Sequence, residues 1–392
     1  MNSSDVAVAI PPSLPRLFAS FLRLGTTAFG GPAMVAYIRK MAVEQNHWLD
    51  DASFQDGVAL CLTIPGATAM QTAAYVGLRS RGIAGAAACF VGFGLPAFCF
   101  MAGLSAVYAR TYDLPLVLAA FQSLRAMTVA IVANAALTFG KRSLRGPADI
   151  IIAGLAAALF AVKMNPILVI LLAALLGLVL YRRVRPKPPA TVEPAVKTRS
   201  RWRVMPILLV VAAGFALLFS ASRELFDLGV LMFRIDLFAF GGGFASVPLM
   251  HHEVVDVRSW MNSETFLNGI ALGQVTPGPI VITATFVGYL LHGVAGAVIA
   301  TASVFLPSFL MVVGIVPYFD RLRASDRFNR CMSGILASFV GLLLSVTAQF
   351  ALGVQWDVPR IVLAGAALVA LLLRVDVLWV VLVGVALSVM ML

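Results

Sequence analysis

Apolar runs long enough to cross a lipid bilayer recur along the whole chain, and they restrict its fold more than any other feature. Backbone groups inside hydrocarbon must bond to one another, so such runs form helices or a closed barrel. The short alternating strands of a barrel are absent from the sequence. With a mean hydropathy of +0.94 and only 12% charged residues, the chain is predicted to be an all-α polytopic membrane protein. The membrane segments are expected at about 14–38, 53–77, 83–107, 115–140, 147–162, 165–182, 204–222, 228–250, 264–290, 293–317, 330–351, 358–373 and 376–391.

A basic stretch in the middle of the chain sets the expected orientation. Residues 182–203, RRVRPKPPATVEPAVKTRSRWR, are rich in proline and charge, cannot bury a core and are expected to form a cytoplasmic linker. If every segment crosses the bilayer once, the N-terminus is cytoplasmic and the C-terminus is periplasmic. Trp48 then lies outside and Trp260 lies in the cytoplasm. The first residues show no pattern of a cleavable signal peptide.

The chain repeats itself at an offset of 211 or 212 residues. FLRLGTTAFGGP (21–32) matches FRIDLFAFGGG (233–243), and HWLDDASFQDGVAL parallels SWMNSETFLNGIAL. Segment 204–222 has no partner, so about six segments per repeat plus one connector insert the second repeat upside down relative to the first. Pairs of short segments could instead form re-entrant hairpins. A hairpin adds no crossing and two helices add two, so the number of crossings stays odd or even as before. The predicted domains are an N-terminal repeat (1–181), the linker (182–203), a connecting transmembrane helix (204–222) and a C-terminal repeat (223–392).

Each repeat contains two glycine and proline interruptions within apolar segments. Proline removes an amide, and a half-helix that begins at a break presents unpaired N–H groups to an anion. Broken helices at matching positions of inverted repeats indicate the substrate site of a transporter. The alternative is a kink or close helix packing through glycine. The breaks are Gly30-Gly31-Pro32 and Pro65-Gly66 in the first repeat, and Gly241-Gly242-Gly243 and Pro277-Gly278-Pro279 in the second.

Charged residues also fall inside apolar segments. Arg23 and Arg234 occupy equivalent positions, and we expect them to face a polar cavity and attract a multivalent oxyanion, unless they snorkel to a membrane face. Asp236 is expected either to relay protons or to form a structural ion pair with another helix. Arg125 is a further candidate, although its repeat partner is Leu336.

Uncharged polar side chains flank the proline-glycine breaks. These side chains either donate hydrogen bonds to the oxygens of an oxyanion or form hydrogen bonds between helices. They are Gln71, Gln274, Thr276, Thr283 and Thr285. No metal site or cofactor is predicted, because the neighbouring residues His251-His252-Glu253 do not converge easily on one ion. No P-loop motif of an ATPase module is present.

These motifs resemble those of the chromate ion transporter family in its long-chain, two-repeat form. The similarity rests on FGGP (29–32), FGGGFASVPLM (240–250) and ALGQVTPGP (271–279), and it covers both repeats. The first repeat departs from the family pattern at Leu62 and Ala67, and Met34 stands where many members have histidine. The resemblance implies a secondary transporter, not an enzyme, that exports chromate across the bacterial inner membrane, with proton exchange as a coupling mode.

Energetics agrees with export. Moving a dianion outward gains about 2 × 2.3 kcal/mol per 100 mV when the cell interior is negative. The alternative is a transporter of sulfate or another oxyanion that works as an importer. The expected partners are chromate or sulfate and the lipid bilayer, with a homodimer left open and nucleic acid not expected.

Overall fold

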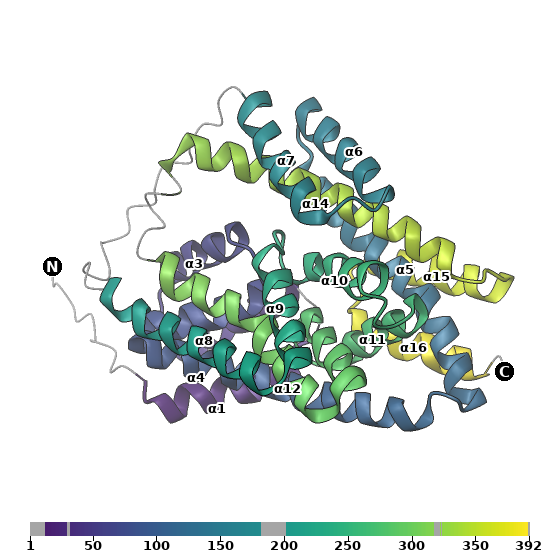
Figure 1. The fold of residues 1–392 in the computed structure, drawn as a ribbon, viewed down its shortest axis with the longest axis horizontal. Coiled ribbons are helices and arrows are strands. Elements are labelled where there is room, and N and C mark those ends of the chain that lie inside the picture. The colour runs from purple at the N-terminus through teal and green to yellow at the C-terminus, as the bar shows by residue number, and fades with distance from the viewer. Residues whose placement is uncertain (1–11, 30–31, 182–200, 317–321, 323, 391–392) are drawn as a thin grey trace, which may run out of the picture.

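The computed structural model describes residues 12–29, 32–181, 201–316, 322 and 324–390, and every regular element in these ranges is a helix (Figure 1). The first half forms α1 (Leu14–Thr27), α2 (Pro32–Arg39), η1 (Lys40–Gln45), α3 (Asp51–Thr63), α4 (Thr68–Thr111), α5 (Pro115–Ser143), α6 (Pro147–Ala161) and α7 (Pro166–Leu180). After α8 (Arg201–Ala221), the second half forms α9 (Arg223–Leu237), α10 (Gly243–His251), η2 (His252–Val257), α11 (Ser263–Val275), η3 (Ile280–Ile282), α12 (Thr283–Ile315), α14 (Asp326–Gly353), α15 (Val358–Leu372) and α16 (Val377–Met390). The all-α prediction is confirmed for the described residues, while residues 182–200 of the expected linker lie outside them.

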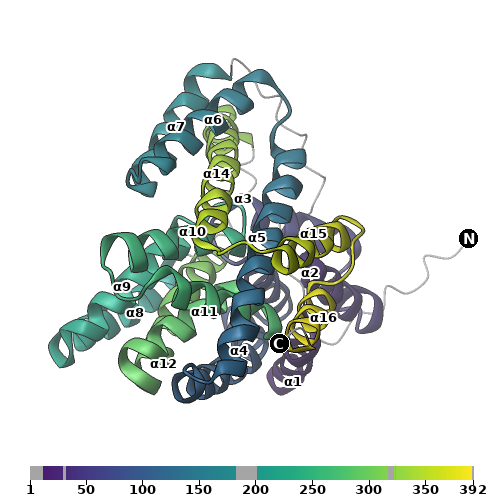
Figure 2. The same cartoon turned by 90° about the vertical axis from the view of Figure 1, so that its right-hand side faces the viewer.

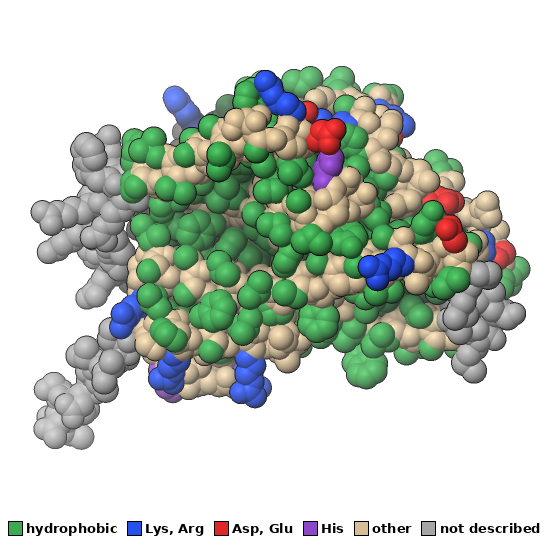
Figure 3. All heavy atoms as spheres, turned by 60° about the horizontal axis from the view of Figure 1, so that its bottom comes forward, with side chains coloured by type: hydrophobic (Ala, Val, Ile, Leu, Met, Phe, Trp, Pro, Cys, Tyr) green, Lys and Arg blue, Asp and Glu red, His purple; other side chains and the backbone are tan. Residues whose placement is uncertain are grey.

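Several described helices have the length and composition of membrane spans. Within the described residues, four apolar stretches reach this length: Thr68–Thr111, Ala120–Ser143, Ile280–Ile315 and Asp326–Gly353. Figure 3 shows a surface dominated by apolar side chains, interrupted by scattered charged groups. Such a surface fits a lipid environment, because soluble proteins rarely expose large contiguous apolar patches.

The two halves of the chain have the same order of elements. In each half a short helix runs into a π-helical turn, Lys40–Gln45 or His252–Val257. A 13-residue helix follows in both, α3 in the first half and α11 in the second. Two long helices and a short helical hairpin complete each half, and α8 stands between the halves without a counterpart. The repeat that the sequence predicts is therefore also a repeat of structure.

The apolar segments 53–77 and 264–290 fold into hairpins. The Tyr75 hydroxyl donates to the Ser53 carbonyl at 3.1 Å, and a Cβ on Gly269 would lie 2.4 Å from Phe286 Cδ1. In a straight helix, positions 269 and 286 would be about 25 Å apart. The chain turns back at the predicted breaks, so the expectation that each of these segments crosses the bilayer once is wrong. We call residues 64–67 the first tip and residues 276–279 the second tip.

The long helices α4 and α12 each reverse direction at a glycine. Gly82 and Gly293 have φ of 66° and 58°, in the left-handed region that glycine adopts without a steric penalty. A Cβ on Gly77 would lie 2.1 Å from the carbonyl oxygen of Gly85, because the stretch before the reversal packs against the stretch after it. Residues 83–111 and 294–315 are consequently the parts of α4 and α12 that run from one end of the molecule to the other.

One end of the molecule, which we call the N-terminal end, gathers the start of the chain and several turns. Arg16 Nη2 donates to Asn46 Oδ1 at 3.2 Å, which places the start of α1 beside the end of η1. The expected segment 14–38 therefore enters and returns on the same side instead of crossing. Ile83, Ile207 and Ile315 pack against one buried cluster, so the α4 reversal, the start of α8 and the end of α12 also lie together.

The opposite end gathers the corresponding elements of the second half. His292 Nδ1 lies 3.6 Å from Glu224 Oε2, which joins the α12 reversal to the start of α9. Arg360 donates to Gln122 Oε1 at 2.6 Å and so joins the start of α15 to the first turns of α5. The second half thus begins at the end opposite to the one where the first half begins.

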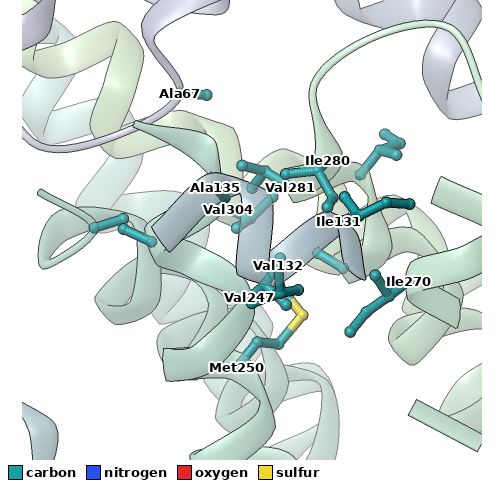
Figure 4. Close-up of a cluster of buried hydrophobic side chains, with 14 of the residues drawn as sticks. Ala67, Ile131, Val132, Ala135, Val247, Met250, Ile270, Ile280, Val281 and Val304 are labelled. Carbon is teal, nitrogen blue, oxygen red and sulfur yellow. The ribbon is translucent and has the colours of Figure 1, made fainter. Parts of the chain in front are cut away.

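The short hairpins are exchanged between the halves. The α6–α7 hairpin packs on α14, and the α15–α16 hairpin packs on α5 (Figure 2). A Cβ on Gly341 would lie 2.3 Å from the Ala153 carbonyl oxygen, and one on Gly384 would lie 2.1 Å from Met127 Sδ. These close approaches interlock the halves around the tips. Figure 4 shows part of this buried core, which includes Ala67 of the first tip, Val281 of η3 and the α5 residues Ile131, Val132 and Ala135.

Candidate transport site

Each tip is joined to the other half of the chain by a backbone hydrogen bond, and the two bonds are reciprocal. The amide of Gly66 donates to the Ala239 carbonyl at 2.9 Å, and the amide of Gly278 donates to the Ala28 carbonyl at 3.0 Å. Ala28 and Ala239 are equivalent at an offset of 211, so each tip bonds to the break that follows the first helix of the other half. Such an exchange is the signature of a two-fold relation. The structure thereby brings Pro65-Gly66 to the break after α9, and Pro277-Gly278 to the break after α1.

These bonds qualify one expectation from the sequence. The amides of Gly66 and Gly278 already have carbonyl partners, so these two groups are not free to bind an oxyanion. Both glycines have positive φ, 115° and 112°, as tight tips require. Their role in the structure is to close the tips.

Three helix N-termini converge beside the tips. A Cβ on Gly242 would lie 3.1 Å from Thr68 Oγ1 at the start of α4, and one on Gly243 would lie 3.1 Å from Val281 Cγ2 in η3. Thr68, Gly243 and Ile280 are the first residues of their helices. First-turn amides have no acceptor inside their own helix, and the helix dipole adds partial positive charge. The locus is therefore suited to a buried anion.

The break after α9 lies at this locus and consists of glycines with positive φ. Gly241 and Gly242 have φ of 98° and 92°, a backbone conformation that residues other than glycine rarely adopt. The equivalent residues of the first repeat, Gly30 and Gly31, lie outside the described residues.

Asp236 lies at the first tip and is completely buried. Its Oδ2 accepts hydrogen bonds from the Ser308 amide at 3.1 Å and from the Ser308 hydroxyl at 2.7 Å. The Ser308 hydroxyl in turn accepts from the Ala67 amide at 2.9 Å. Gln71 Nε2 donates to the Pro65 carbonyl. A carboxylate is thus fixed directly against the start of α4.

The structure does not bring Arg23 and Arg234 together. Arg234 forms an ion pair with Glu253, which is only 10% exposed, and the two line a small pocket with Pro166 and Phe238. Arg23 is exposed and makes no ion pair within the described part of the chain. Arg234 therefore has a structural partner, and Arg23 is free to interact with lipid, water or an anion.

The uncharged candidates have mixed surroundings. The Thr276 hydroxyl donates to the Leu272 carbonyl at 2.8 Å. The Thr283 hydroxyl donates to the Ile280 carbonyl at 2.9 Å, and Thr285 bonds to Thr301 at 2.6 Å. Gln274 Nε2 is buried and has no partner among the described residues. Of these side chains, Gln274 keeps a donor that a ligand could use, and Pro279 with Pro277 shapes the turn of the second tip.

One residue of interest was not a candidate from the sequence, and one further candidate has more partners than expected. Ser308 was missed, although comparison with its repeat partner Ala97 shows a polar residue replacing a small apolar one. Arg125, the further candidate from the sequence, donates from Nε to Asn268 Oδ1 at 2.9 Å, and its Nη1 lies 3.1 Å from Glu264 Oε1. Arg125, Glu264 and Arg360 line a pocket of about 100 Å³ at the opposite end. The described residues contain no group of three His, Cys, Asp or Glu side chains that could hold a metal.

Comparison with known proteins adds evidence of descent. The family model described as chromate transporter matches residues 15–178 and again residues 226–389. An uncharacterised transporter of Methanocaldococcus jannaschii is 44% identical over 353 residues, which are 90% of this chain and 88% of that protein. A chromate transport protein of Cupriavidus metallidurans is 31% identical, covering 95% of this chain and 91% of the relative. One of Pseudomonas aeruginosa is 30% identical, with 89% and 84% covered. No solved structure matches.

Proposed function

Because the chain belongs to the chromate transporter family, whose members are membrane transporters and not enzymes, we propose that it is a secondary transporter that exports chromate across the bacterial inner membrane. Chromate is a divalent tetrahedral oxyanion. The proposed binding region comprises both tips, the glycine breaks, Gln71 and Gln274, with Arg23 and Arg234 as fixed positive charge near its approaches. Asp236 is the proposed residue that couples anion movement to protons.

The observation that carries this proposal is the convergence of helix N-termini at the crossing of the two repeats. The start of α10 lies against both of the others, because Gly242 faces Thr68 of α4 and Gly243 faces Ile280 and Val281 of the η3–α12 unit. Backbone amides at helix starts bind oxyanions without a permanent countercharge, so the anion can also leave. A site between repeats and midway along the molecule is where secondary transporters bind their substrates.

The distribution of basic residues supports an inverted arrangement of the repeats in the membrane. The first repeat begins at the N-terminal end, where α1 starts, and the second begins at the opposite end, where Glu224 joins His292. The positive-inside rule favours the N-terminal end as cytoplasmic. That end carries basic residues at turns and helix ends, namely Arg16, Arg39, Lys40, Arg79, Arg81, Lys141, Arg142 and Arg145, whereas the opposite end carries Arg110, Lys163, Arg223, Arg258 and Arg360.

Vesicles of defined orientation test the proposal. Inside-out vesicles that contain the protein should accumulate radiolabelled chromate when the lumen is positive, because the potential drives a dianion out of the cytoplasmic side. Arg23→Ala should remove most of this uptake, and Arg110→Gln, which changes an exposed arginine at the end of α4, is the matched control. Unlabelled sulfate should compete if the site selects tetrahedral dianions. Uptake of sulfate alone, and only into right-side-out vesicles, would instead establish the sulfate importer.

A further inference from the structure

The two-fold relation gives the two tip glycines equivalent surroundings, and only those of Gly66 are polar. A Cβ on Gly66 would lie 2.2 Å from Ser308 Oγ and 3.0 Å from Asp236 Oδ2. A Cβ on Gly278 would lie 2.7 Å from the Cβ of Ala97, which is the repeat partner of Ser308. The partner of Asp236 is Gly25. The fold therefore requires neither the carboxylate nor the hydroxyl at this position, since the second tip closes without them.

The polar side chains beside Gly66 include two buried oxygen atoms without a donor. Asp236 Oδ2 is satisfied by Ser308, and Gln71 Nε2 is satisfied by the Pro65 carbonyl. Asp236 Oδ1 and Gln71 Oε1 are both buried and have no hydrogen-bond partner among the described residues. Gln71, Asp236 and Ser308 are each 0% exposed. Unsatisfied buried oxygens of this kind call for a bound proton, ion or water.

No charged side chain in the described part of the chain neutralises Asp236. The contacts on it come from Ser308 on α12 and from the first tip, and none of these groups titrates. Gln71 on α4 is uncharged. On its own helix α9, Arg234 is engaged by Glu253. A fully buried carboxylate without a countercharge is strongly unfavourable, so neutralisation has to come from outside the protein.

We propose that Asp236, Gln71 and Ser308 form a binding site for one monovalent cation, a proton or Na⁺, and that this cation and the oxyanion bind together. A single carboxylate with neutral oxygens suits a single positive charge, because divalent ions take more anionic ligands. The second part of this inference rests on the proposed function. Ala67, which donates to Ser308, directly precedes α4, so a charged Asp236 would repel a dianion at the α4 N-terminus.

Neutralising Asp236 removes this repulsion, and reciprocity requires that the bound anion also raises the affinity for the cation. The two ions then move in the same direction. One cation and one dianion together carry one net negative charge across the membrane, so an interior-negative potential still favours export.

Binding measurements on the purified protein in detergent test the inference. Chromate and sulfate affinities are measured over a pH series in choline buffer, and again at fixed pH with NaCl replacing choline chloride. We expect affinity to rise at least about tenfold along one series, in the range of ordinary coupling between sites. A rise at low pH identifies the proton, and a rise with NaCl identifies Na⁺.

Variants separate the site from general effects. Asp236→Asn should bind the anions tightly whatever the pH or NaCl concentration. Ser308→Ala, which reproduces the Ala97 environment, should need more cation for the same anion affinity. Ser303→Ala, a buried serine on the same helix, is the matched control. The inference is overturned if the wild type shows no cation dependence, or if both Asp236→Asn and Ser308→Ala keep the wild-type dependence.

If neither chromate nor sulfate binds at all, the proposed function fails while the cation site is still tested. Radiolabelled Na⁺ binding and the infrared band of a protonated carboxyl group are then measured in the wild type and in Asp236→Asn. Loss of either signal in the variant supports the cation site, and signals that are absent in the wild type or unchanged in the variant overturn it.

Discussion

At the residue scale, Gly278 and Ala97 offer a direct test of tip packing. Gly278→Ala introduces a Cβ at positive φ, which costs about 1–2 kcal/mol, and places it 2.7 Å from the Ala97 Cβ. Adding Ala97→Gly removes the contact but leaves the backbone strain. We expect the single variant to lose thermal stability and transport, and the double variant to recover part of both. Thermal unfolding and chromate flux measure the loss and the recovery. If the double variant recovers neither, backbone strain at position 278 alone causes the loss.

Arg234 and Arg23 should behave differently on substitution. Arg234→Met removes the closer of the two arginines that face Glu253 and leaves it only Arg258, whose Nε lies 3.9 Å from Oε2; a buried group that loses its hydrogen bond costs about 1–3 kcal/mol. Arg234→Met with Glu253→Gln should restore stability. If the double variant also restores chromate flux, Arg234 holds α9 against η2 and does not attract the anion.

Arg23→Ala should leave unfolding unchanged, because Arg23 is exposed and makes no ion pair in the described residues. A loss of chromate flux in this variant would then report on the anion path itself. Equal losses of stability in Arg23→Ala and Arg234→Met would contradict this distinction.

At the scale of elements, sequence predicted where the chain breaks but not how it continues. Glycine and proline within apolar runs mark the breaks because these residues weaken helices locally. Hydropathy does not report direction, so a hairpin such as α3 with the start of α4 has the same pattern as one interrupted span. Packing determines that these segments turn back, because Gly57 leaves room for Tyr75 and Gly269 leaves room for Phe286. Ser308 and Asp236 illustrate the same limit, since they are distant in sequence and meet only after α12 packs on α9.

The hairpin geometry changes what proline substitutions at the second tip should do. Pro277→Ala with Pro279→Ala cannot produce one continuous helix over 264–290, because α11 and α12 run antiparallel around Gly269 and Phe286. We expect loss of about 0.4–1 kcal/mol of unfolding free energy per proline through greater freedom of the unfolded chain. Chromate affinity should fall only modestly, with chloride and nitrate remaining poor competitors. Urea unfolding and detergent binding assays measure both, and an abolished site would show that the prolines themselves position the anion.

At the scale of the whole molecule, the helices that join the two ends determine the orientation of the repeats. Within the described residues these are 83–111, α5, α8, 294–315 and α14, an odd number, while the hairpins enter and return on one side. The start of α1 and the end of α16 therefore lie at opposite ends (Figure 1). The number of crossings is odd whether each segment crosses once or some segments form hairpins. What changes is the side on which each connecting turn lies.

Cysteine labelling beside the two equivalent tryptophans tests this arrangement. Counting every segment as one crossing would place Trp48 outside and Trp260 in the cytoplasm. The Arg16–Asn46 hydrogen bond instead places the turn around Trp48 at the N-terminal end, and the Arg125–Glu264 ion pair places the turn around Trp260 at the opposite end, with Arg360. With the basic end in the cytoplasm, a cysteine at His47 should react with an impermeant maleimide only in inside-out vesicles, and one at Ser259 only in right-side-out vesicles. Both positions are turn residues with positive φ, so the matched pair samples equivalent sites of the two repeats. Labelling of both from one side would rule out inverted repeats, and labelling in the reverse sense would restore the single-crossing count.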